Sequence, residues 1–318
     1  MKKRILGGVE VSAIGMGCMG FSHAEGKQTD IDTAAEVLRE AVDIGYTYFN
    51  TGWNYGNVTD PHHNEKILGR AFAGIRDKVV ISSKCGVDFD YAVNPDKPPL
   101  LFDFSRDKVR QSVEESLERL NTDYIDFYLQ ARIDPKTEPE DAAETMAELI
   151  KEGKILHWGI SEADEEYLRR ANTVCPISVV ENRYNIMDRK NECLIPFLEE
   201  YGIGWIAFTP LMKGLLTNTF EKGTVFAPDD WRSNQITDEN LDKSSAIRSY
   251  LNTLAAEKNA TVTQLSLAWL LNRKPYIVPI PGMKKASRLA ENAAAAEIIL
   301  SADEMQKIDD LYAAVKQN

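Results

Sequence analysis

Residues 48–56 of the chain read YFNTGWNYG, and this stretch indicates a buried strand that opens into a loop. An apolar run ends at Asn50, and Gly52 follows as a turn residue. Two aromatic residues, Trp53 and Tyr55, come next, and we expect both to face solvent. A strand of an α/β barrel delivers polar and aromatic groups to a ligand in this way, at its carboxyl end.

Outward from this stretch, strand-like and helix-like segments alternate along the whole chain. Strands are expected at 11–20, 47–50, 78–84, 124–130, 154–161, 177–182, 203–210 and 276–282. Helices are expected at 31–44, 63–74, 105–120, 138–152, 163–173, 190–200, 241–258, 261–273 and 284–295, and a last one begins at the capping box Ser301 to Glu304. Eight such units predict a closed (β/α)8 TIM barrel, a single domain over residues 1–318 with extra helices.

The composition of the chain indicates which kinds of molecule it can bind. The chain has 318 residues, 43% of them hydrophobic, which suffices for one large core. The net charge of −12 argues against a nucleic-acid surface, and no apolar run approaches a membrane span. The N-terminus lacks the apolar segment of a secretory signal, and four scattered cysteines suit a reducing compartment, so we expect a cytoplasmic protein. A small-molecule substrate is therefore the expected partner, and the oligomeric state is not predicted.

Neither the glycines near the N-terminus nor the histidines indicate a Rossmann-type dinucleotide site or a metal site. Gly15, Gly17 and Gly20 match the GxGxxG dinucleotide fingerprint, but no helix follows directly, as that motif requires. We interpret Gly17 and Gly20 instead as positions where a ligand approaches the mouth of the first strand. The four histidines have no metal-site spacing, so no metal is expected.

The segment at about 211–240 is the longest without predicted structure. It is rich in Gly, Asn and Asp and contains Trp231. Loops of that length inside a compact domain are usually functional, so we interpret the segment as a lid over the ligand.

Lys84 follows the apolar run VVISS, so its stem is expected to be buried and its ammonium to emerge at the barrel rim. The plain alternative is a surface lysine that reaches into solvent. Placed beside Tyr55, however, the ammonium favours the phenolate, so it is expected to ease proton release from a group with an ordinary pKa of about 10. Tyrosine and lysine together then form a general acid for a carbonyl oxygen as hydride arrives.

A second cluster lies at IPGMKKASRLAEN, residues 280–292. Lys284, Lys285 and Arg288 come at the start of a helix, where cations oppose the helix dipole and suggest an anionic guest. The phosphate of an adenine dinucleotide, with Asn292 on the base, accounts for the group. The plain alternative is a solvated charged face.

At this point the chain resembles the aldo-keto reductase family over nearly its whole length. The matching blocks include IGMGCMGFS, NYG, NEKILGRAF, the SSK strand, LERLNTDYIDFY, MAELIKEGKI, WGISEA, YGIGWIAFTPL, DDWR and the final IPG-KK-R-EN. The resemblance implies a single barrel that binds NADP(H). It places Lys284, Lys285 and Arg288 on the 2′-phosphate, Glu291 and Asn292 on the adenine, Phe208 against the nicotinamide, and Ser161 and Glu181 on its carboxamide. We add Gly20 to the expected cofactor residues.

The family's usual catalytic set is Asp, Tyr, Lys and His, and this sequence keeps only Tyr55 and Lys84. Asn50 stands at the Asp position, Ala131 at the His position, and Glu181 replaces a usual Gln. Asn50 accepts a hydrogen bond from Lys84 but cannot offset its charge, so Lys84 either titrates lower or pulls harder on Tyr55. Loss of the oriented donor at Ala131 costs about 10²–10³ in rate.

Three functions stay open on this evidence. The first is a carbonyl reductase that relies on Tyr55 and Lys84, with Asn50 in the catalytic set. The second is reduction of an activated C=C bond, as in family members that also lack the histidine. The third is a non-catalytic NADP(H)-binding sensor or regulatory subunit.

Substrate contacts are less defined. Trp53 and Trp231 either line the substrate pocket or pack the lid, and the hollow at Ala131 is expected to hold substrate or water. His23, after the first strand, is a hypothetical replacement for the missing histidine.

Overall fold

Eight parallel strands form one curled sheet in the computed structural model, which describes residues 1–90, 92–94, 98–227 and 230–317. Their order across the sheet is β12-β11-β10-β9-β8-β5-β4-β3. The strands are β3 (Met16–Gly17), β4 (Tyr48–Asn50), β5 (Val80–Cys85), β8 (Ile125–Gln130), β9 (Ile155–Ser161), β10 (Val179–Arg183), β11 (Gly204–Phe208) and β12 (Ile277–Pro279). The order follows the sequence around the sheet, which is the topology predicted for a barrel.

The sheet closes where the first barrel strand meets the last. The Gly15 amide donates to the Pro279 carbonyl at 2.9 Å, and Gly17 pairs with Gly282 in a parallel bridge. A Cβ on Gly17 would lie 2.8 Å from the Ile280 carbonyl oxygen. The close approach that requires glycine here is therefore made by the neighbouring backbone, and not by a ligand as the sequence had suggested.

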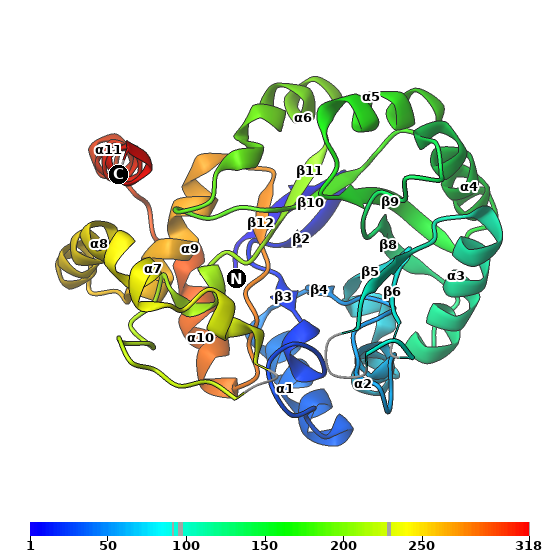
Figure 1. The fold of residues 1–318 in the computed structure, drawn as a ribbon, viewed down its shortest axis with the longest axis horizontal. Helices are drawn as coiled ribbons and strands as arrows, with labels where there is room; N and C mark the ends of the chain where they lie inside the picture. The colour runs from blue at the N-terminus through cyan, green and yellow to red at the C-terminus, as the bar shows by residue number, and fades with distance from the viewer. Residues whose placement is uncertain (91, 95–97, 228–229, 318) are drawn as a thin grey trace.

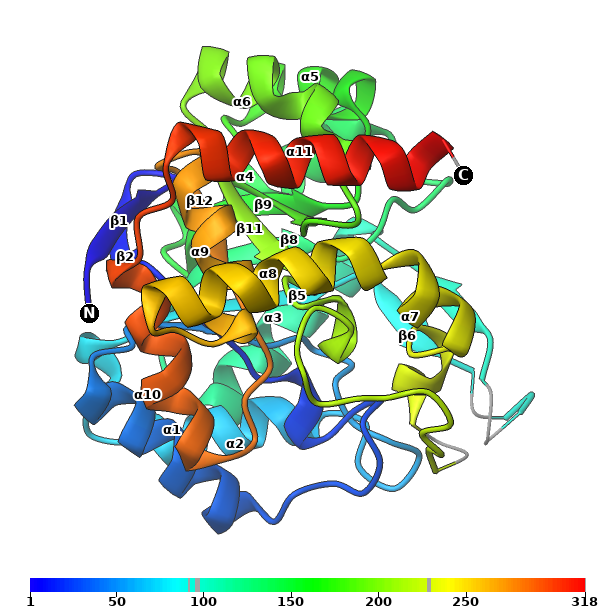
Figure 2. The ribbon, with the colours of Figure 1, turned by 90° about the vertical axis from the view of Figure 1, so that its left-hand side faces the viewer.

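Helices surround the sheet, with α2 to α6 following one another around one side in Figure 1. They are α1 (Ile31–Ile44), α2 (His63–Phe72), α3 (Arg106–Leu120), α4 (Pro139–Lys151), α5 (Glu165–Val174), α6 (Ile195–Tyr201), α7 (Asp238–Lys243), α8 (Ser245–Lys258), α9 (Val262–Arg273), α10 (Ala286–Ala294) and α11 (Ala302–Gln317). Short 3-10 turns are η1 (Met19–Phe21), η2 (Arg76–Lys78), η3 (Lys190–Leu194), η4 (Met212–Gly214), η5 (Trp231–Asn234) and η6 (Ala295–Glu297). Figure 2 shows α8 and α11 lying outside the barrel, along the side that faces the viewer. Within the described part of the chain, no helix combines the length and apolar character needed to cross a bilayer.

Two antiparallel hairpins were not predicted. The first joins β1 (Lys3–Leu6) to β2 (Val9–Ser12) through Gly7 and Gly8, whose φ angles are 53° and 89°. Two consecutive residues with positive φ are the geometry of a tight hairpin turn. The second joins β6 (Val87–Phe89) to β7 (Leu100–Phe102).

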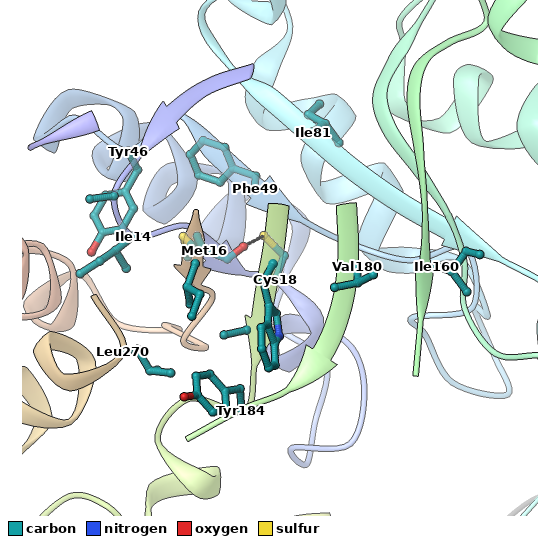
Figure 3. Packing of buried hydrophobic residues seen from close by; sticks show 14 of the residues in the cluster. Ile14, Met16, Cys18, Tyr46, Phe49, Ile81, Ile160, Val180, Tyr184 and Leu270 are labelled. Atoms are coloured by element: carbon teal, nitrogen blue, oxygen red, sulfur yellow. Dashed lines mark hydrogen bonds between the residues drawn. The ribbon is translucent and has the colours of Figure 1, made fainter. Parts of the chain in front are cut away.

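The core has two layers because alternate residues of a strand face opposite sides of the sheet. One cluster contains strand residues such as Tyr48, Leu129 and Ile206, and it also includes Leu6 and Val11 from the first hairpin. The larger cluster joins the other strand face to the helices, and Figure 3 shows part of it around Phe49. Asn50 thus shares the face of Tyr48 at the carboxyl end of β4.

The segment at 211–240 contains more structure than the sequence indicated. Leu215, Ile236 and Leu241 form a small separate apolar cluster, and η4, η5 and the start of α7 lie within the segment. The Trp231 amide donates to the Ala24 carbonyl at 3.1 Å, which ties the segment to the loop after β3. Residues 228–229 of the expected lid, and with them part of DDWR, lie outside the described residues.

Candidate active site

Polar side chains from three strands meet at the carboxyl end of the barrel. Asn50 ends β4, Lys84 is next to last in β5, and Glu181 lies in β10. All three side chains are buried. The sequence placed each of them at a strand end, and the barrel brings them into direct contact.

The Lys84 ammonium makes the central contacts of this cluster. It donates to the Glu181 carboxylate at 2.8 and 3.1 Å and to Asn50 Oδ1 at 3.0 Å. The side chains of Lys84 and Glu181 are only 5% and 4% exposed. Burial is the largest single influence and lowers the pKa of Lys84, but the Glu181 carboxylate and Tyr55 together outweigh it, so the pKa lies above its usual range. The alternative in which Lys84 titrates lower is therefore wrong, because Glu181 supplies the negative charge that Asn50 cannot.

Tyr55 lies in the loop after β4, with the Lys84 Nζ 5.2 Å from the centroid of its ring. Its backbone carbonyl accepts hydrogen bonds from Ser22 Oγ at 2.8 Å and from the Asn64 amide at 3.0 Å, which fix the loop. A Cβ on Gly52 would lie 3.2 Å from the Tyr55 ring, so this glycine leaves space for the ring.

The expected lowering of the Tyr55 pKa is not found. Burial raises the pKa of the phenol most; Lys84 lowers it and Glu181 raises it, so the net direction is upward. The prediction considered the ammonium but neither the loss of solvent nor the carboxylate behind it. The phenol is consequently in its protonated form at neutral pH, which is the form that donates a proton.

Ala131 directly follows β8 and is 7% exposed. The next residue, Arg132, was not singled out from the sequence, yet its Nη1 donates to the Ala131 carbonyl and to Ser161 Oγ at 3.1 Å. Its charge also lowers the pKa of Tyr55. A guanidinium therefore lies near the position that the sequence described only as a hollow.

Several aromatic rings pack around His23 next to Tyr55. The His23 ring stacks on Tyr55 at 5.9 Å and contacts Phe89 and Trp231, each at 5.1 Å. Its Nδ1 lies 2.7 Å from the Gly56 carbonyl oxygen, and burial lowers its pKa, so the ring is neutral with the proton on Nδ1. His23, Phe89 and Trp231 line a pocket of about 750 Å³. Phe89 had no sequence signal beyond its type.

Trp53 does not face solvent as expected. It is 4% exposed, its indole donates to Glu115 at 3.3 Å, and Lys108 lies over its ring at 4.4 Å. Among the described residues, Trp231 lines the pocket beside His23 and Trp53 does not. The role of Trp53 in substrate binding stays a prediction.

The cationic cluster lies at the start of α10, where the sequence placed it. Lys284 donates to the Glu25 carbonyl at 2.9 Å, Lys285 is the N-cap residue, and Arg288 pairs with Glu291 at 2.7 Å. Asn292 is 2% exposed, and its Oδ1 is buried without a hydrogen-bond partner in the described structure. An unpartnered buried acceptor is costly, so it indicates a donor that this chain does not supply.

Two other expected cofactor residues differ in what surrounds them. Phe208 ends β11 and is half-buried, with the Arg183 guanidinium 5.8 Å above its ring; Arg183 was not predicted. A Cβ on Gly20 would lie 2.7 Å from the Glu25 carboxylate, so the space beside this glycine is filled by protein. The role of Gly20 in cofactor binding stays a prediction.

Comparisons with known proteins agree with one another. A family model described as the Aldo/keto reductase family matches residues 13–313. A probable aldo-keto reductase 1 from Glycine max is 32% identical over 309 residues, which cover 95% of this chain and 85% of that protein. The glycerol dehydrogenase of Gluconobacter oxydans superposes with a TM-score of 0.89 at 25% identity, covering 99% of this chain and 96% of the other. An aldo-keto reductase from Klebsiella pneumoniae, solved with NADP and acetate, gives 0.75 at 26% identity over 98% and 96%.

Proposed function

Because this chain belongs to the aldo-keto reductase family, we propose that it is an NADP(H)-dependent oxidoreductase that reduces the carbonyl of an aldehyde, ketone or sugar. The observation that carries the proposal is the buried Lys84 ammonium, 5.2 Å from the ring of Tyr55, at the barrel mouth. Tyr55 is the general acid, Lys84 assists it, and Asn50 accepts a hydrogen bond from Lys84.

The cofactor NADP(H) fits residues of this chain at both ends of the barrel mouth. Lys284, Lys285 and Arg288 provide cations at the start of α10 for the 2′-phosphate, and the unpartnered Asn292 Oδ1 suits an amino group of the adenine. Glu291 lies on the same helix. At the other end, Phe208 would contact the nicotinamide and Ser161 its carboxamide. The Klebsiella pneumoniae relative, which was crystallised with NADP, supports NADP(H) as the cofactor.

When bound, the cofactor supplies a hydride to the carbonyl carbon. The carbonyl oxygen then gains negative charge, and the Tyr55 phenol donates its proton to that oxygen. The ammonium of Lys84 stabilises the phenolate that remains. Each pKa unit by which Lys84 lowers the pKa of Tyr55 corresponds to about 1.4 kcal/mol. Ala131, Trp231 and Trp53 are the proposed substrate contacts. Of these, Trp231 lines the pocket of about 750 Å³ that also contains His23 and Gly56, which is large enough for a small carbonyl compound.

The test is an NADPH-oxidation screen over sugars, aldehydes, ketones and enones, run beside Tyr55→Phe. Turnover of a carbonyl compound that is lost in Tyr55→Phe, while NADPH still quenches protein fluorescence, supports the proposal. Turnover of enones alone indicates reduction of an activated C=C bond. NADPH binding without oxidation over the whole panel indicates a sensor or regulatory subunit, and contradicts the proposal.

A further inference from the structure

Lys84, Glu181 and Asn50 form a closed ring of hydrogen bonds. Glu181 accepts from Lys84 through both carboxylate oxygens, at 2.8 and 3.1 Å. Asn50 Nδ2 donates to Glu181 Oε2 at 2.8 Å, while Asn50 Oδ1 accepts from Lys84 at 3.0 Å. Asn50 Nδ2 also donates to Ser82 Oγ at 2.8 Å. Each donor and acceptor of the ring thus has a partner of opposite kind, so the orientation of the Asn50 amide is fixed.

The buried Lys84 ammonium needs one negative counter-charge, and Glu181 is the residue that provides it. Among the residues that the structure describes, Glu181 is the carboxylate within ion-pair distance of Lys84. An uncompensated ammonium at this burial would be strongly unfavourable. Asn50 reaches the same ammonium from β4 with a neutral oxygen. The charge that holds Lys84 therefore comes from β10, across the barrel mouth, and Asn50 only relays hydrogen bonds.

We infer that Glu181 is a positioning residue, which holds the Lys84 ammonium beside Tyr55 and sets how strongly that ammonium acts on the phenol. The inference rests on the proposed function for its catalytic consequence. It also reassigns Glu181, because a carboxylate with both oxygens bonded to the protein is poorly placed to hold a carboxamide of the cofactor.

The geometry allows the charge to be moved without changing the ring. Asn50 Oδ1 already lies 3.0 Å from Lys84 Nζ, so Asp at position 50 places a carboxylate oxygen there. Gln at position 181 keeps an acceptor for Lys84 but removes the charge. The pair of changes therefore transfers one charge from β10 to β4, and each single change leaves the cluster with one charge too few or too many.

The experiment compares wild type, Glu181→Gln, Asn50→Asp and the double variant. The rate of hydride transfer from NADPH to a substrate from the screen is measured in a single turnover, and NADPH affinity by fluorescence. Glu181→Gln should slow transfer about tenfold or more, leave the NADPH Kd within about threefold, and be rescued by the added Asn50→Asp. An unchanged rate in Glu181→Gln, or no rescue in the double variant, would overturn the inference. Loss of NADPH affinity with an unchanged rate at saturation would return Glu181 to the cofactor site.

A second measurement does not depend on turnover. The pKa of Tyr55 is obtained by ultraviolet difference titration, subtracting the Tyr55→Phe form of each variant. It should change by about one unit or more in Glu181→Gln, which removes both the carboxylate and the contact that holds Lys84, and return in the double variant. A Tyr55 pKa that is the same in all backgrounds overturns the inference. If wild type turns over no carbonyl compound, the proposed function fails, and this titration still decides the role of Glu181.

Discussion

Replacing Arg119 with methionine should destabilise the protein by about 3 kcal/mol, because it leaves a carboxylate buried without a counter-charge. Arg119, on α3, donates through Nε to Glu65 on α2 at 2.8 Å, and Ser83 Oγ donates to the other oxygen at 2.6 Å. The Glu65 side chain is fully buried, whereas that of Arg119 is 13% exposed. Breaking a buried pair costs about 3–5 kcal/mol, and the partial exposure of Arg119 places this case at the lower end.

This ion pair matters for the site because of what it joins. Ser83 directly precedes Lys84, and α2 follows the loop that carries Tyr55. Glu65 thus holds the two elements that present the proposed acid and its ammonium. Arg119→Met should therefore lower stability, while the fraction that remains folded keeps its NADPH affinity.

The assay is urea unfolding followed by tryptophan fluorescence, with the slope of the transition as a check that the unfolded state is unchanged. Arg119→Met combined with Glu65→Gln removes both charges but keeps an acceptor for Ser83, so it should recover about 2 kcal/mol of the loss. Arg106→Met on the same helix is the matched control, since the pair of Arg106 with Glu148 is 61% and 38% exposed and should be worth less than about 1 kcal/mol. A loss below 1 kcal/mol in Arg119→Met, or a double variant no more stable than the single one, refutes the reasoning.

Three further outcomes test separate parts of the site. The pKa values of both Tyr55 and Lys84 lie above their ordinary ranges, and both groups act in their protonated forms. The rate of hydride transfer should therefore be constant from about pH 7 to pH 9 and decline only above about pH 10. A pH profile in which the rate declines with a midpoint near neutrality contradicts this. Arg288→Gln should weaken NADPH binding by about 10- to 100-fold and leave NADH binding unchanged, because only NADPH carries the 2′-phosphate; equal losses for the two cofactors in fluorescence titrations exclude the role. His23→Phe keeps the stack on Tyr55 but removes the ring nitrogens, so it should lower kcat/KM by up to about tenfold if His23 binds substrate; steady-state kinetics identical to wild type remove His23 from the site.

The barrel was predictable because its signals are local. The helix at 31–44 was placed to the residue, since the Asp30 side chain accepts from the Thr33 amide at its start and Gly45, at a φ of 105°, ends it. The capping box from Ser301 to Glu304 is also confirmed, with both hydrogen bonds present. Ser105 occupies its expected N-cap position before α3, although its side chain makes no capping hydrogen bond.

The two hairpins were missed for different reasons. The strands of the first have only four residues each, and the Gly7–Gly8 turn between them was an available signal that the alternation of barrel units obscured. The second hairpin exposes the apolar residues of β7, a pattern that neither alternation nor a continuous buried run describes.

The ion pair of the site was not predictable in the same way. Lys84 and Glu181 are 97 residues apart, and Asn50 and Glu181 are 131 apart. The sequence placed all three at strand ends, but which side chains meet depends on how the sheet curls. The direction of the Tyr55 pKa was wrong for a related reason, because the charge of Lys84 was evident in the sequence and the extent of burial was not.

The most direct test of the central claim is the single-turnover oxidation of bound NADPH by a carbonyl substrate, compared between wild type and Tyr55→Phe. If Tyr55 donates the proton, Tyr55→Phe should be slower by about 10² or more, with an NADPH Kd within about threefold of wild type. A Tyr55→Phe enzyme that transfers hydride at the wild-type rate would contradict the account.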